Sequence, residues 1–72
     1  MSNKLVILGQ SGDEEILWDT KDLSSVETAD QSFTRLIKQG YLAFDKEKGN
    51  EQVRKFDPNA HEITFVPRHV GG

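Results

Sequence analysis

The sequence predicts an α+β fold, with one helix packed across a face of a mixed sheet of four to five strands. Short segments rich in β-branched and aromatic residues alternate with turn residues, as strands do. A single longer segment, between the second and third of these strands, has apolar residues at helical spacing. The resulting order is ββαβββ, and its 72 residues suffice for one small domain. A sheet crossed by one helix is the simplest way to bury both patterns.

The first two strands are predicted to form an antiparallel hairpin. Residues 4–9 are an apolar run rich in β-branched residues, which is typical of a strand buried on both faces. Residues 9–13 contain two glycines and favour a turn. Residues 15–19 form a second short strand, on which Ile16 and Trp18 share a face.

The predicted helix has two candidate starts and a clear end. Ser24-x-x-Glu27 and Thr28-x-x-Gln31 both fit the capping box, in which side chains bind the first free N–H groups. The helix then carries one apolar stripe, formed by Ala29, Phe33, Leu36 and Ile37. Gly40 is expected to end it in a left-handed conformation. This stripe is predicted to face the core.

Two further strands and two connections follow the helix. Residues 41–44 and 52–56 are predicted strands, and in the second Val53 and Lys55 lie on the face opposite Arg54 and Phe56. The charged residues 45–51 form a loop between them. Residues 57–60, Asp-Pro-Asn-Ala, fit a type I turn with proline at its second position.

The last strand ends abruptly and leads into a tail. Ile63 and Phe65 point to one face of this strand, with Thr64 and Val66 on the other. Pro67 ends the strand because it has no N–H to donate. We therefore expect a single domain over residues 1–67 and a flexible tail over 68–72. This tail adds little to a core and ends with Gly71 and Gly72, which suggests that the terminal carboxylate is the functional group. The alternative is that the two glycines are incidental, since loose ends tolerate them.

Composition excludes several classes of function. Twelve acidic and nine basic side chains give a net charge of −3, which argues against a nucleic-acid-binding protein. With no cysteine, the chain has no disulfide, thiolate metal ligand or catalytic thiol. Two histidines without clustered carboxylates do not indicate a metal site, and we expect no catalytic residue and no intrinsic enzyme activity. The longest apolar run, residues 5–8, is too short to span a membrane, so we expect a soluble cytoplasmic protein.

The last residues carry a family resemblance. The segment Glu62-Ile63-Thr64-Phe65-Val66-Pro67-Arg68-His69-Val70-Gly71-Gly72 resembles the C-terminus of ubiquitin-like proteins of the β-grasp fold. It is most similar to the sulfur-carrier branch, whose members end with an acidic residue, an aliphatic strand, a proline, a short spacer and Gly-Gly. Molybdopterin-synthase members usually have a second proline where this chain has Arg68. The Arg68-His69 pair is instead similar to the basic approach to Gly-Gly in ubiquitin.

The resemblance implies a chemistry performed with partners. An E1-like adenylating enzyme would use Mg-ATP to activate the carboxylate of Gly72. Gly71, which has no side chain, would let the terminus enter the enzyme's site. The chain itself would need no cofactor. The acyl group would then pass to a lysine, with an E2-like enzyme or a target protein, or become a thiocarboxylate. Arg68, His69 and Val70 would dock at the mouth of the enzyme's channel. The chain is expected to be a monomer when free, and no one lysine stands out as an acceptor.

A docking surface is the remaining expectation. Trp18, Tyr41 and Val66 are candidates for an interface on the sheet face away from the helix, where exposed apolar residues mark binding sites. For Trp18, burial as ordinary packing is the alternative. The alternative function is a small binding or structural module, such as a phage or operon accessory protein.

Overall fold

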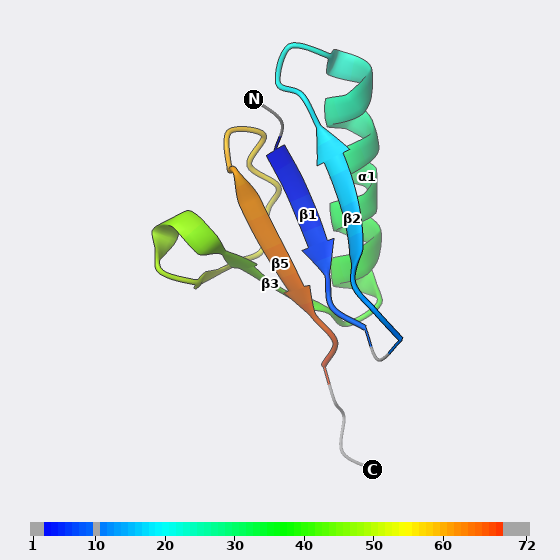
Figure 1. Ribbon diagram of the computed structural model, residues 1–72, viewed down its shortest axis with the longest axis vertical. Helices are drawn as coiled ribbons and strands as arrows, with labels where there is room; N and C mark the ends of the chain where they lie inside the picture. Colours follow the sequence, from blue (N-terminus) through cyan, green and yellow to red (C-terminus); the bar gives the residue numbers. More distant parts are fainter. Residues whose placement is uncertain (1–2, 10, 69–72) are drawn as a thin grey trace.

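The computed structural model describes residues 3–9 and 11–68 (Figure 1). Along the chain the elements are β1 (Asn3–Ile7), β2 (Glu14–Trp18), α1 (Leu23–Lys38), β3 (Leu42–Asp45), the 3₁₀ turn η1 (Lys46–Lys48), β4 (Glu51–Val53) and β5 (Glu62–Val66). The five strands form one mixed sheet, and α1 lies across one face of it (Figure 1). The predicted α+β class and element order are confirmed. Within the described residues, no helix is long and apolar enough to cross a bilayer.

The last strand occupies the middle of the sheet. The strand order is β2-β1-β5-β3-β4, with β5 parallel to β1 and antiparallel to β3. The parallel ladder extends beyond the strand ends, since the Lys4 N–H donates to the His61 carbonyl at 2.9 Å and the Leu8 N–H to that of Phe65 at 3.0 Å. Hydrogen bonds on both edges therefore fix the position and direction of β5 up to its end.

The first strand is buried on one face only. Leu5 is completely inaccessible to solvent, whereas Lys4 and Val6, which point the other way, remain partly exposed. The prediction of burial on both faces is therefore wrong. The apolar run does not indicate burial on both faces here, because α1 covers a single face of the sheet and no described element covers the opposite face (Figure 1).

The core lies between α1 and the sheet. Its buried apolar members are Leu5, Trp18, Ala29, Phe33, Leu36, Ala43, Ala60, Ile63 and Phe65. Aromatic rings meet edge to face in its centre, with ring centroids 5.2 Å apart for Phe33 and Phe65 and 5.1 Å apart for Trp18 and Phe56. These contacts join α1, β2, β5 and the segment that precedes β5 into one packed unit.

Helix α1 starts earlier than either predicted capping box. Asp22 is the N-cap, and its carboxylate accepts hydrogen bonds from the N–H groups of Ser24 at 3.1 Å and Ser25 at 3.4 Å. The hydroxyl of Thr28 is already inside the helix and donates to the Ser24 carbonyl at 3.0 Å. Asp is as good an N-cap as Ser, so the start is set by the residue placed at the end of the β2–α1 connection.

The end of α1 is the predicted one. Gly40 has a φ of +97°, its N–H donates to the Ile37 carbonyl at 3.0 Å, and the Tyr41 N–H donates to that of Leu36 at 3.0 Å. This pair of bonds is the Schellman motif, which satisfies the last carbonyls and favours glycine at the left-handed position. The chain is thereby turned directly into β3.

The fourth strand is shorter than predicted, because β4 ends at Val53. Val53 and Phe56 both pack against the core. Residues three apart on a strand point to opposite faces, so the strand must end between them for both to be buried. The structure has a turn at the predicted residues 57–60: the Ala60 N–H donates to the Asp57 carbonyl at 3.0 Å, and the Asn59 N–H donates to the Asp57 carboxylate at 2.9 Å.

Candidate functional site at the chain exit

The chain leaves the body at the end of β5. Val66 is the last residue of the strand, and Pro67 and Arg68 are both exposed. Figure 1 shows that the short segment after the β5 arrow continues in the direction of the strand. The predicted reactive residues Gly71 and Gly72, and the predicted docking residues His69 and Val70, lie outside the described residues. Of the predicted tail, the structure thus places Arg68 alone.

Apolar side chains gather beside this exit, on the sheet face opposite α1, which we call the open face. Val66 lies next to Leu42 in the β3–β5 register, and Leu8 follows the neighbouring strand β1. One step further from the exit, Thr64 separates Val6 on β1 from Phe44 on β3. We call the half-buried apolar residues of this face the open-face cluster: Val6, Leu8, Leu42, Phe44 and Val66.

The far end of the open face is charged. The Lys4 ammonium lies 3.5 Å from a Glu15 carboxylate oxygen and 3.9 Å from one of Glu62, and Lys46 lies 4.0 Å from Glu62. All of these side chains are at least partly exposed, so each pair contributes little to stability. The open face is therefore graded, from ion pairs at the start of β5 to apolar side chains at its end.

Thr64 is a polar residue that lies between Val6 and Phe44 of the open-face cluster. Its hydroxyl oxygen is shielded from solvent and has no hydrogen-bond partner. A buried hydroxyl without a partner is unfavourable by about 1–3 kcal/mol. The hydroxyl therefore does not stabilise the fold at this position, although the β-branched side chain suits a strand.

The other two predicted interface residues lie elsewhere. Trp18 is 1% exposed on the helix side of the sheet, and its indole N–H donates to the Pro58 carbonyl at 3.0 Å. The interface prediction for Trp18 is therefore wrong, and its interpretation as packing is right. Tyr41 is partly buried against the core and is not part of the open-face cluster. Only Val66 lies where the prediction placed all three.

Sequence reasoning missed most of the open-face cluster, although a signal was present. Val6 alternates with Leu5, and Leu42 and Phe44 alternate with Ala43. Once a single helix is assigned to one face, alternation assigns these residues to the other. Interpreting residues 4–9 as a strand buried on both faces hides this assignment for Val6.

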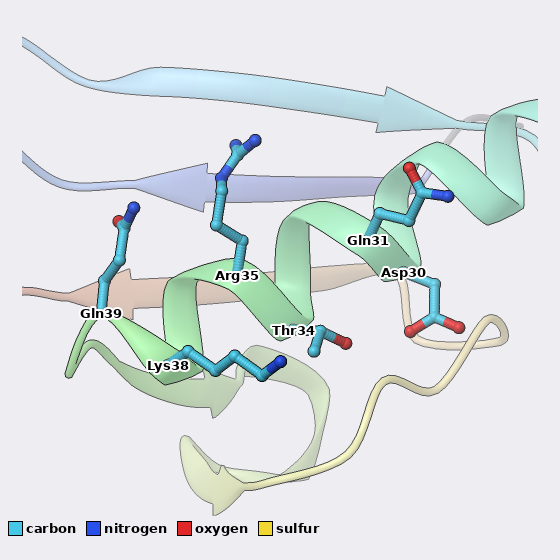
Figure 2. A pocket seen from close by; sticks show the side chains of 6 residues that line it. All are labelled: Asp30, Gln31, Thr34, Arg35, Lys38 and Gln39. Carbon is cyan, nitrogen blue, oxygen red and sulfur yellow. The ribbon is translucent and has the colours of Figure 1, made fainter.

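A surface hollow on the outer side of α1 is formed by the helix alone. Its lining residues all come from the helix and its C-cap and are all exposed: Asp30, Gln31, Thr34, Arg35, Lys38 and Gln39 (Figure 2). Figure 2 shows these side chains spread along one helix, with the sheet behind it. A hollow between flexible side chains of one helix has no fixed walls, and we assign it no function.

Histidine and carboxylate side chains are also dispersed. In residues 3–9 and 11–68, no three or more of them come together in a way that could hold a metal ion. The side chains of His61 and Glu47 pair with each other, and both are exposed.

The chain matches no protein-family model, and no curated protein or solved structure shows significant similarity to it. Its function must therefore be argued from the geometry of the exit and of the open face.

Proposed function

We propose that this chain is a ubiquitin-like protein modifier or sulfur carrier whose reactive group is the carboxylate of Gly72, whether that end is translated or exposed by trimming. The observation that carries the proposal is the placement of β5. Hydrogen bonds from β1 and β3 hold this strand in the centre of the sheet, and the chain then leaves the body through the exposed residues Pro67 and Arg68. The last described residues, Pro67 and Arg68, thus follow the central strand of the sheet, which is paired on both edges.

The architecture supports the β-grasp assignment within this proposal. The element order, the mixed sheet and the single helix across one face are the features expected from the resemblance of residues 62–72 to the C-terminus of ubiquitin-like proteins. The strand that carries this segment is also paired throughout its length. A fold alone does not determine function, so the proposal depends on the exit as well.

The chemistry begins with a partner enzyme that holds Mg-ATP. A Gly72 carboxylate oxygen attacks the α-phosphorus of ATP, which forms the acyl-adenylate and releases pyrophosphate. A partner's sulfur or thiolate then attacks the acyl carbon and AMP leaves, so that one difficult step is divided into two. The product is a thiocarboxylate, or a thioester from which a lysine amine takes the acyl group as an isopeptide.

In this scheme the protein supplies reach and recognition. Gly71 and Gly72 lack a Cβ, so their backbone can enter a narrow site and adopt conformations that other residues avoid. The open-face cluster, beside the exit, is the surface on which we expect the adenylating enzyme to dock. Docking through an apolar surface next to the tail would hold the carboxylate near the nucleotide and so raise the effective concentration of the carboxylate.

The experiment is an intact-mass measurement. The purified chain is incubated with Mg-ATP, a sulfur donor, and the adenylating enzyme of the same organism. We expect either the mass increase of one sulfur replacing one oxygen, or a covalent adduct whose isopeptide joins Gly72 to a lysine. The unreacted mass also establishes which residue ends the native chain.

Gly72→Ala is the matched variant, because it adds a methyl group beside the reacting carbon and leaves every described residue unchanged. We expect product formation to fall at least about tenfold, as small misplacements of a reacting group commonly cause, with an unchanged Tm. A chain that gives no product with the enzyme would instead be a binding module. Equal product from wild type and variant would also contradict the proposal.

A further inference from the structure

Two adjoining hollows form a groove along the side of α1 that the proposed chemistry does not use. The first lies between α1 and the segment that follows β4, and the second continues around the C-terminal end of α1 to the chain exit. Ile37 and Arg54 line both hollows and so connect them. We call this surface the basic groove, and its charged lining residues are Asp30, Lys38, Arg54, Lys55 and Arg68.

The rim of the groove is positive in a protein that is negative overall. Four of its five charged residues are basic, although the chain has a net charge of −3. None of the four takes part in an ion pair with another described residue, whereas Lys4 and Lys46 on the open face are paired with glutamates. The positive charge of the groove is therefore not neutralised by the described part of the chain.

The floor of the groove is apolar. In the first hollow it is formed by Phe33, which is buried, together with Ile37 and Phe56, which are partly buried. Phe56 is held by its ring contacts with Trp18 and Phe33. The hollow measures about 420 Å³, within the range of binding pockets, about 300–1,000 Å³. An apolar, partly aromatic floor beside exposed basic side chains suits a ligand that is apolar at one point and anionic around it.

We propose that the basic groove binds an acidic segment of a partner protein, with an aromatic or large aliphatic side chain inserted between Ile37 and Phe56. The carboxylates of that segment would pair with Lys38, Arg54 and Lys55 at the rim. Arginine is well suited to this role because its guanidinium binds a carboxylate through two parallel hydrogen bonds. At the end of α1, where the helix dipole is negative, the carbonyls of Leu36 and Ile37 are bonded within the Schellman motif, which reduces their repulsion of an anion.

A peptide fits these observations better than a nucleic acid does. Affinity for a nucleic acid comes mainly from many phosphate contacts, and four cations in an acidic protein provide few. The apolar floor, by contrast, provides binding energy that is independent of charge. The groove also reaches Arg68, so a segment bound in it would lie beside the exit. This inference needs only the groove, and it holds whether or not Gly72 is reactive.

The test uses a short fluorescein-labelled peptide of Asp and Glu with a central Phe-Leu pair, titrated against the whole protein at low salt. We expect saturable binding by fluorescence anisotropy, with amide NMR shifts concentrated at residues 37–38 and 54–56. Arg54→Glu combined with Lys55→Glu should weaken binding about tenfold or more, since two ion pairs are lost and two repulsions gained. The matched control, Lys21→Glu combined with Lys48→Glu, makes the same change of net charge outside the groove and should leave most of the binding intact.

Two further probes separate the contributions. A peptide with Gly-Ser in place of Phe-Leu should bind several-fold more weakly, because it leaves the apolar floor uncovered. Equal binding of that peptide, equal weakening by both double variants, or shifts confined to the open face would each overturn the proposal. Tighter binding of a single-stranded oligonucleotide of equal charge would overturn it in favour of a phosphate-binding surface. None of these measurements requires ATP or an adenylating enzyme, so their failure is distinct from failure of the proposed function.

Discussion

Leu17 and Trp18 are neighbours in sequence and opposites in environment. On β2, Leu17 points away from α1 and is 58% exposed, while Trp18 points toward it and is 1% exposed. The sequence identified the pairing of Ile16 with Trp18 on one face, but not which face the helix would cover. That choice depends on the handedness and path of the β2–α1 connection, which no local pattern specifies.

Replacing each of these two residues by alanine tests the assignment. Trp18→Ala should lower the free energy of unfolding by about 3–5 kcal/mol, because it removes a fully buried aromatic side chain and leaves a cavity. Leu17→Ala should change it by no more than about 0.5 kcal/mol. Urea unfolding followed by circular dichroism measures both. A small effect at Trp18 would mean that its ring is not in the core.

Thr64 provides a second test at the residue scale. Thr64→Val keeps the shape of the side chain and removes the hydroxyl that has no partner. We expect the free energy of unfolding to rise by about 1 kcal/mol. Thr34→Val, at an exposed helical position, is the control and should be nearly neutral because Thr and Val have similar helix propensities. Destabilisation by Thr64→Val would show that the hydroxyl has a partner after all.

At the scale of elements, local patterns predicted the existence and order of the helix and strands, and failed at several boundaries. The C-terminal end of α1 was predictable because glycine at Gly40 has a conformational reason to be there. Its N-terminal end was not, because Asp22, Ser24 and Thr28 are all competent caps. The end of β4 was set by tertiary packing, since Phe56 must turn back to meet Trp18 and Phe33.

The competing caps can be distinguished by mutation. Asp22→Ala should lower the free energy of unfolding by about 1 kcal/mol, since the N–H groups of Ser24 and Ser25 lose their acceptor. Ser24→Ala should have an effect within about 0.5 kcal/mol, because the Ser24 side chain caps nothing and alanine favours a helix. Thermal unfolding of both variants is sufficient. The reverse ranking would place the start of the helix at Ser24.

At the scale of the whole molecule, the mixed sheet brings the chain exit, where β5 ends at Val66, next to the open-face cluster. The sequence contained the apolar residues of that cluster, but the cluster exists only because β5 lies between β1 and β3. Strand order is a long-range property, and alternation specifies faces without specifying neighbours. The basic groove escaped prediction for the same reason, since it joins Lys38, Arg54 and Arg68 from distant parts of the chain.

The central claim is that the Gly72 carboxylate is activated as an acyl-adenylate, and pyrophosphate exchange tests it most directly. Adenylation is reversible, so an adenylating enzyme that accepts this protein will incorporate labelled pyrophosphate into ATP only when the protein is present. We expect exchange that saturates with wild-type protein and falls at least about tenfold with Gly72→Ala. An exchange rate that does not depend on the wild-type protein, or that is equal with the variant, would contradict the account.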